Sequence, residues 1–210
     1  MRHIVLGTRG STLALRQAEL VTLALRAAEP GIEVDVSVVR TEGDKRLDVS
    51  LETMGGQGVF VKEIEQRLLN HDIDIAVHSL KDMPAETPPA LAIGAVLPRA
   101  DARDALVGRD GTDLAALPKG ARIGSDSRRR ALQIAALRPD VTFASIRGNV
   151  DTRLRKVEAG DYDAVALAAA GLERLGLLDR ATQLFSTREV LPAAGQGTIA
   201  VECRCDDTEV

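Results

Sequence analysis

The sequence predicts an α/β fold, because segments with a two-residue apolar period alternate with segments of about 3.6-residue period along most of the chain. Hydrophobic residues make up 45% of the 210 residues and charged residues 28%, a balance that supports a packed core in a globular protein. This length is sufficient for two modest domains. We therefore expect strands and helices to alternate in two successive blocks.

The first block contains three expected strands and two expected helices. Residues 3–6 form a short strand, residues 32–38 alternate apolar and polar side chains, and residues 73–77 form a largely apolar strand. A helix that ends near residues 30–31 separates the first two strands, and a second helix precedes the third. The apolar faces of these helices are formed by Ala14, Ala18, Val21, Leu25 and Ala28, and by Val61, Ile64 and Leu68.

The second block repeats this pattern with shorter strands. We expect strands at residues 122–124, 141–146 and 164–167. Helices are expected at residues 128–137 and 150–158, and a short helix follows the last strand. This order again predicts a sheet with helices between its strands.

Two proline- or glycine-bearing polar stretches, residues 98–104 and 191–197, flank the second block and are the expected crossovers between domains. Ile199, Val201 and Cys203 alternate on a strand that we expect to return to the first domain. The predicted domain 1 therefore comprises residues 1–98 and 192–210, and the predicted domain 2 comprises residues 99–191.

Composition excludes several classes of protein. No apolar run approaches the roughly 20 residues of a membrane span, and the chain starts without a signal-peptide stretch, so we expect a cytoplasmic protein without membrane contact. Cys203 and Cys205 are too close for an easy disulfide, and His3, His71 and His78 are scattered, so no metal site is expected. The net charge of −4 and 2% aromatic residues favour a small polyanionic ligand over nucleic acid.

Three segments share one design, in which a strand ends, small residues turn the chain, and a helix begins with arginine nearby. They are residues 7–11, 124–130 and 147–153. Small residues let backbone N–H groups at a helix start face a ligand, and arginine offers a planar fork that matches a carboxylate. A single such segment is also explained by a capped helix with solvated arginines. Three of them favour carboxylate clamps.

Other candidate residues are less decisive. Glycines at residues 55–58 predict either a lid or a flexible surface turn, and the spacing of a phosphate loop is missing. Asp82 follows an apolar strand and should face a cleft, where a carboxylate can carry protons or stabilise a developing cation; an ordinary surface ion pair is the alternative. We expect His78 to be a hydrogen-bonded structural residue and Cys203 to belong to the core.

The ordered motifs resemble those of the porphobilinogen deaminase family over essentially the whole chain. The resemblance begins with Gly-Thr-Arg-Gly-Ser from Gly7 and includes Asp-Ile-Ala-Val-His-Ser-Leu-Lys-Asp-Met-Pro from Asp74. It continues through residues 60–63, 103–106, 147–154, 167–175 and 191–197.

This resemblance implies two domains similar to periplasmic binding proteins, each a mixed sheet flanked by helices, with an active site in the cleft between them. It implies a transferase of tetrapyrrole (porphyrin and heme) biosynthesis that condenses porphobilinogen, with loss of ammonia, into hydroxymethylbilane on a dipyrromethane cofactor. By the same resemblance Asp82 is catalytic. The residues implied to bind the carboxylates of substrate and cofactor are Arg9, Ser11, Ser79, Lys81, Ser125, Ser127, Arg129, Arg130, Arg147, Arg153, Arg174 and Gln196.

The sequence departs from the family pattern at several places. Gln57 stands where many members have lysine, and Arg128 replaces a leucine, which adds charge beside the second clamp. The family's third domain, which carries the cofactor cysteine, is expected to be absent, since neither Cys203 nor Cys205 matches that anchor. Two functions remain open: an enzyme, expected as a monomer acting on porphobilinogen and oligopyrrole intermediates, or a non-catalytic module that binds pyrrole polycarboxylates or other anions.

Overall fold

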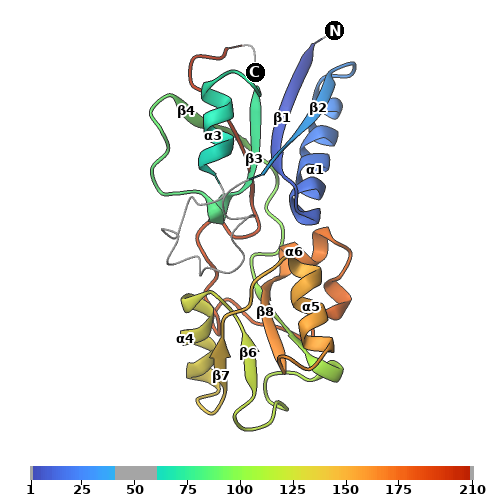
Figure 1. Ribbon diagram of the computed structural model, residues 1–210, viewed down its shortest axis with the longest axis vertical. Helices are drawn as coiled ribbons and strands as arrows, with labels where there is room; N and C mark the ends of the chain where they lie inside the picture. Colours follow the sequence, from blue (N-terminus) through green and yellow to red (C-terminus); the bar gives the residue numbers. More distant parts are fainter. Residues whose placement is uncertain (1, 41–60, 209–210) are drawn as a thin grey trace. The chain divides into compact units, whose positions relative to one another are not determined.

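The computed structural model describes residues 2–40 and 61–208 and divides into two compact units (Figure 1). The first unit comprises Met1–Arg99 and Thr198–Val210, and the second comprises Ala100–Gly197. Each unit contains a five-stranded mixed sheet. The predicted α/β class is confirmed.

The sheet of the first unit has the strand order β2-β1-β3-β10-β4. Strands β1, β2 and β3 are parallel, and β10 is antiparallel to both β3 and β4. The carboxyl ends of β1 and β3 therefore lie at the same edge of the sheet. The bounds are β1 His3–Arg9, β2 Glu33–Val39, β3 Ile75–Ser79, β4 Leu91–Val96 and β10 Ile199–Arg204.

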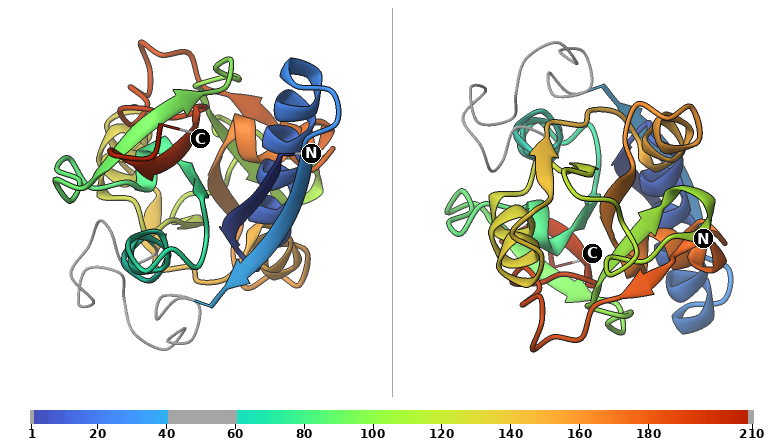
Figure 2. Two further views of the ribbon diagram at one scale, coloured as in Figure 1. Left: turned by 90° about the horizontal axis from the view of Figure 1, so that it is seen from above. Right: turned by 90° about the horizontal axis from the view of Figure 1, so that it is seen from below.

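Two helices, α1 (Thr12–Ala28) and α3 (Lys62–Leu69), cover opposite faces of this sheet (Figure 2). Alternate residues of the strands divide between two cores accordingly. Ala18 and Val21 of α1 pack in one core, and Ile64 and Leu68 of α3 pack in the other. A single 3₁₀ turn, η1 (Leu80–Asp82), follows β3.

The sheet of the second unit has the order β7-β6-β8-β5-β9. Strands β6, β7 and β8 are parallel, whereas β5 runs antiparallel to its neighbours β8 and β9. The bounds are β5 Asp104–Gly108, β6 Arg122–Gly124, β7 Thr142–Ala144, β8 Ala164–Ala168 and β9 Gln183–Leu184.

The helices of the second unit also cover both faces of its sheet. Ile134 of α4 (Arg128–Leu137) packs in one core, and Leu154 of α5 (Val150–Glu158) packs in the other together with Leu172 of α6 (Ala169–Arg174). Two 3₁₀ turns, η2 (Arg109–Gly111) and η3 (Leu178–Arg180), join the remaining elements.

Three strands were not predicted from the sequence, and each lacks the alternation on which the prediction rests. All five residues of β5 are buried, so both of its faces carry small or apolar side chains after Asp104. Strand β4 reads as a short apolar run, and β9 contains only two residues. The expected strand at residues 141–146 is shorter than predicted, since β7 covers Thr142–Ala144.

The second crossover groups with the second unit up to Gly197, whereas the sequence placed residues 192–197 in domain 1. Gln196 lies in that stretch and hydrogen-bonds the backbone carbonyl of Ala102 at 2.7 Å. Beyond it, β10 pairs with β3 and β4 of the first unit. The division into family domains, including a third one, stays a prediction. The glycine-rich stretch at 55–58 lies outside the described residues.

A polar cluster is buried between α3 and the sheet of the first unit. His78 Nε2 lies 3.2 Å from Glu202 Oε2, and their side chains are 4% and 0% exposed. Glu65 of α3 is also buried, and its burial, reinforced by the charge of Glu202, raises the pKa of its carboxyl above the ordinary value. The folded protein therefore favours a proton on Glu65.

Glu65→Gln should increase the free energy of unfolding at neutral pH relative to the parent chain. A raised carboxyl pKa means that the folded state binds more protons than the unfolded state, so stability falls as pH rises from the ordinary value through the raised one. Glutamine does not titrate, so the stability of the variant does not fall with rising pH for this reason. Thermal unfolding at acidic and at neutral pH measures the difference; Glu33→Gln, at an exposed position of β2, should behave as the parent. Equal destabilisation of Glu65→Gln at both pH values would contradict the assignment.

Candidate carboxylate-binding site

The predicted site residues, with the exception of Gln196, follow the carboxyl ends of parallel strands. In the first unit, Arg9 ends β1 and Ser79 ends β3. In the second unit, Ser125 follows β6 and Arg147 follows β7. Ligands of open α/β sheets collect at such edges because the strands end there and helix amino-termini begin.

In the first unit, helix α1 fixes two of the predicted hydroxyl groups. Ser11 caps α1, and its Oγ accepts a hydrogen bond of 3.2 Å from the Ala14 backbone N–H. The buried Gln17 donates from Nε2 to Ser79 Oγ at 2.9 Å. Because Ser11 acts as an acceptor in the cap, its hydroxyl proton can be donated to a ligand.

Lys81 and Asp82 lie on the 3₁₀ turn η1, directly after Ser79. Lys81 is half-buried, Asp82 is exposed, and Met83 behind them is buried with 5% exposure. The turn is thus anchored by an apolar side chain while its carboxylate reaches solvent. Arg9 at the end of β1 is half-buried.

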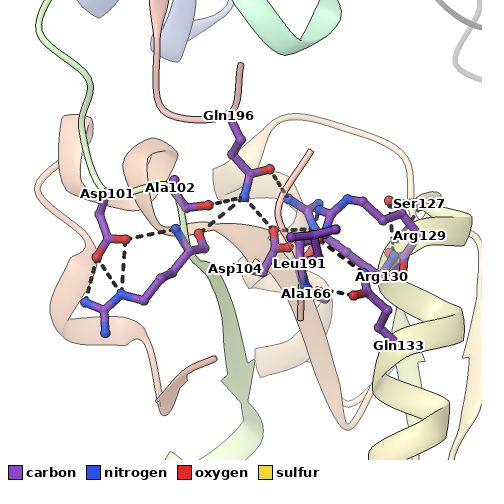
Figure 3. Close-up of polar contacts among 12 residues, drawn as sticks. Asp101, Ala102, Asp104, Ser127, Arg129, Arg130, Gln133, Ala166, Leu191 and Gln196 are labelled. Atoms are coloured by element: carbon purple, nitrogen blue, oxygen red, sulfur yellow. Dashed lines mark hydrogen bonds and ion pairs between the residues drawn. The ribbon is translucent and has the colours of Figure 1, made fainter. Parts of the chain in front are cut away.

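The second unit contains a buried ionic cluster formed by Asp104, Arg129, Arg130 and Gln196, which we call the Asp104 cluster (Figure 3). Asp104 is fully buried. Its Oδ2 lies 2.6 Å from Arg129 Nη1, and its Oδ1 lies 2.8 Å from Arg130 Nε. Gln196 Nε2 donates to the same Oδ1 at 2.9 Å.

The cluster keeps Asp104 ionised in spite of its burial. Burial alone would raise the pKa of this carboxyl, but the charge of Arg130 and the hydrogen bonds from Arg129 and Gln196 outweigh it and lower the pKa below its ordinary value. These ion pairs therefore stabilise the folded state at pH values above the ordinary pKa of an aspartate, and this stabilisation is lost as pH falls through the lowered pKa.

The two arginines of the cluster differ in their surroundings. The Arg130 side chain is 10% exposed and also contacts the Ala166 carbonyl and Gln196 Oε1, both at 3.4 Å. The Arg129 side chain is 25% exposed and donates to the Leu191 carbonyl. Arg128, the departure from the family pattern, is exposed at the start of α4.

A second polar group joins the loops after β6 and β7. Asp126 accepts hydrogen bonds from Ser145 Oγ at 2.5 Å and from the Ile146 backbone N–H at 3.2 Å. Arg153 Nη2 lies 4.0 Å from Asp126 Oδ2, while Arg153 Nε donates to the Gly148 carbonyl at 2.8 Å. The Asp126 carboxylate thus orients the third predicted clamp.

The remaining predicted residues are held by backbone groups. Ser127 caps α4 by accepting from the Arg130 backbone N–H at 3.4 Å, and Ser125 Oγ accepts from the Ser127 backbone N–H at 3.2 Å. Arg174 Nη2 donates to the Gly197 carbonyl at 2.6 Å, and burial lowers the pKa of its guanidinium. Arg174 is therefore directed toward the crossover.

Sequence reasoning missed three residues that organise these groups: Gln17, Asp104 and Asp126. Asp104 stands in the motif Arg-Asp-Ala-Leu from Arg103, and Asp126 stands between two predicted site serines, so both were visible in the sequence. Nothing in the sequence of α1 distinguishes Gln17 from a solvated glutamine, since only its position on the buried helix face brings it to Ser79.

The Cys203 thiol lacks the features of a reactive group. Cys203 and Cys205 are both free, and burial raises the pKa of the Cys203 thiol, which disfavours the nucleophilic thiolate. Cys203 packs against the apolar core beside α1, as expected. Among residues 2–40 and 61–208, no three His, Cys, Asp or Glu side chains lie together as a metal site.

The family model described as "Porphobilinogen deaminase, dipyromethane cofactor binding domain" matches residues 4–210. The chain belongs to the porphobilinogen deaminase family. This family consists of transferases, hydroxymethylbilane synthases, of tetrapyrrole biosynthesis, and the matched domain binds the family's dipyrromethane cofactor.

Full-length relatives agree with this assignment. Porphobilinogen deaminase of Syntrophobacter fumaroxidans is 54% identical over 209 residues, which cover 100% of this chain and 68% of that protein. The protein of the same name from Roseiflexus sp. (strain RS-1) is 52% identical over 207 residues, which cover 99% of this chain and 68% of that protein.

Solved structures show the fold class alone, because their sequences are distant. The ligand-binding component of an ABC-type import system from Staphylococcus aureus has a TM-score of 0.53 at 10% identity, covering 97% of this chain and 66% of that one. The periplasmic aliphatic sulphonate-binding protein of Escherichia coli has a TM-score of 0.50 at 15% identity, covering 97% and 65%. The fold is therefore of the periplasmic-binding-protein type. Within the described ranges, no helix is both long and apolar enough to cross a membrane.

Ser127→Ala should lower the free energy of unfolding by about 1 kcal/mol, because it removes the side-chain cap of α4. Ser127→Thr should retain the cap. Thermal or denaturant unfolding without ligand measures the loss, and Ser127→Thr is the matched control. If ligand-free Ser127→Ala kept the parental stability, Ser127 would have no capping role.

Proposed function

We propose that this chain carries out the family reaction, the stepwise deaminating condensation of porphobilinogen into hydroxymethylbilane. The observation that supports this most is the placement of guanidinium, ammonium and hydroxyl groups directly after the carboxyl ends of parallel strands in each unit. Porphobilinogen carries acetate and propionate groups, and the guanidinium, ammonium and hydroxyl groups of the protein are suited to bind these carboxylates.

The proposed substrate- and cofactor-binding residues form one set with a common chemistry. Each is cationic or has a hydrogen-bond donor, and Arg130 and Gln196 belong to the set through the Asp104 cluster. The set consists of Arg9, Ser11, Ser79, Lys81, Ser125, Ser127, Arg129, Arg130, Arg147, Arg153, Arg174 and Gln196.

A dipyrromethane fits this donor set, because it is a neutral pyrrole framework whose charges are carboxylates. The Asp104 cluster has the matching charge, since two guanidinium groups accompany one carboxylate. The cofactor supplies the nucleophilic pyrrole α-carbon to which the first substrate is joined. Arg129, Arg147 and Arg153 would hold its acidic side chains.

Asp82 is the proposed catalytic residue. When the amino group of the aminomethyl substituent leaves porphobilinogen as ammonia, the C–N bond breaks, the methylene carbon stays on the ring, and positive charge develops on the pyrrole nitrogen. A carboxylate beside this nitrogen stabilises the charge, and it can accept the proton that the attacked pyrrole α-carbon releases after the new C–C bond forms. Its position on a turn anchored by Met83 supports this role.

Asp82→Asn should reduce kcat by about 10²- to 10⁴-fold, the range for loss of a general acid–base group, while porphobilinogen binding changes little. The amide keeps the size of the carboxyl group but cannot carry its charge. Rates of product formation and calorimetric binding to the full chain measure the two effects. The exposed Asp72→Asn provides a control in the same unit. Unchanged turnover in Asp82→Asn would remove Asp82 from the mechanism.

The second candidate function is a non-catalytic module that binds pyrrole polycarboxylates. The proposed carboxylate-binding residues support this second function equally, since they would bind carboxylates whether or not a reaction follows. Mass spectrometry separates the two: a covalent dipyrromethane adduct or product formed from porphobilinogen supports the enzyme, and an unmodified mass with pyrrole binding supports the module.

We also infer that the chain acts in the cytoplasm as a monomer, without nucleic acid or membrane. The net charge of −4 supports the part of this inference that excludes nucleic acid and membrane, because it disfavours binding to polyanionic surfaces. Size-exclusion chromatography with light scattering tests the oligomeric state.

A further inference from the structure

We propose that Asp104 is a positioning residue: it aims Arg129 at a ligand carboxylate and keeps Arg130 as a buried support that does not touch the ligand. This inference rests on the proposed function, because it concerns the same carboxylate-binding site. It assigns a role to Asp104, which lies outside the proposed binding set. Within that set it separates Arg129, which contacts the ligand, from Arg130 and Gln196, which act on the ligand only by holding the Asp104 cluster together.

The geometry of the Asp104 carboxylate is the first observation that supports a positioning role. Each oxygen of Asp104 is engaged by a different arginine, at 2.6 Å by Arg129 and at 2.8 Å by Arg130, and Asp104 itself is fully buried. Strand β5 fixes its backbone through pairing with β8, in which Asp104 lies opposite Ala168. A carboxylate held on an inner strand of the sheet provides a fixed reference for both guanidinium groups, which lie beside it in Figure 3.

The second observation is that Arg129 and Arg130 differ in burial and in their hydrogen-bond partners. Arg130 is surrounded by acceptors from three segments, Asp104, the Ala166 carbonyl and Gln196, and its side chain is only 10% exposed. Arg129 is 25% exposed, although the Leu191 carbonyl also restrains it. A carboxylate arriving from solvent therefore meets Arg129 first, and Arg130 could reach it only by leaving buried partners.

The third observation is the net charge of the Asp104 cluster. Two guanidinium groups and one carboxylate leave one positive charge, which is attractive to an anion. Without Asp104 the two arginines would carry two positive charges but would repel each other, and Arg129 would lose its fixed direction. Net charge and orientation therefore predict opposite effects on binding when this carboxylate is neutralised.

Gln196 completes the support. Its Nε2 donates to Asp104 Oδ1 at 2.9 Å and to the Ala102 carbonyl at 2.7 Å, and the residue is fully buried. The second crossover is thereby fastened to the start of β5 at the place where Leu191 also meets α4. We accordingly assign Gln196, like Arg130, to holding the cluster together.

The test is calorimetric binding of porphobilinogen to the full chain and to Asp104→Asn, with unfolding curves to establish the folded fraction. We expect the folded variant to bind about tenfold or more weakly, since a misdirected group loses its contact with the ligand. Asp101→Asn is the matched control: Asp101 also pairs with an arginine, Arg103, at 2.6 Å in the same unit, and its loss should leave binding within about twofold.

The binding experiment distinguishes failure of the proposed function from failure of the positioning role. If the parent chain does not bind porphobilinogen, the proposed function fails. If the parent binds and folded Asp104→Asn binds equally or more tightly, then net charge governs affinity and the positioning role of Asp104 is wrong.

A second pair of variants keeps the inference testable if Asp104→Asn does not fold. Arg129→Gln leaves the pair of Asp104 with Arg130 in place and should weaken porphobilinogen binding by about tenfold, with a smaller loss of stability than Arg130→Gln. Arg130→Gln removes the buried partner and should lower the melting temperature more than Arg129→Gln, with the smaller effect on affinity of the folded protein. Equal losses of affinity in the two variants would show that both arginines contact the ligand.

Discussion

A single buried carboxylate organises the second unit of this protein. Asp104 is enclosed on β5, and its charge is tolerated only because Arg129, Arg130 and Gln196 surround it. These partners come from a helix start and from the crossover at residues 191–197. The cluster therefore joins three segments that are far apart in sequence, and it fixes the basic groups at the start of α4.

The first unit also holds a short polar segment in place, but it does so with other side chains. Its sheet carries the turn Leu80–Asp82 at the end of β3, and Gln17 and Met83 hold the residues on either side of that turn. The buried pair of His78 and Glu202 lies on the opposite face of the same strand from Ser79. Apolar packing and polar contacts thus support a short segment whose Asp82 carboxylate remains exposed.

The location of the candidate site follows from strand direction. In each unit the parallel strands end at one edge of the sheet, and each predicted clamp lies at or shortly after such an end. The family reaction joins substrates that carry several acids, so a site built from arginines, lysine and serines is chemically suited to it. The same geometry explains why the predicted binding residues occur in short sequence motifs, because each motif contains a strand end, a turn and a helix start.

The sequence by itself determined the α/β class, most helices and the parallel strands, since these depend on local periodicity and on caps such as Ser11 and Ser127. It also identified the family and the residues that follow the strand ends. Only the tertiary structure decided that Asp104 pairs with both Arg129 and Arg130, that Gln17 reaches Ser79, and that β5 lies antiparallel to β8. These contacts join residues distant in the chain, and neither periodicity nor spacing records which buried partner a side chain meets once the sheet has formed.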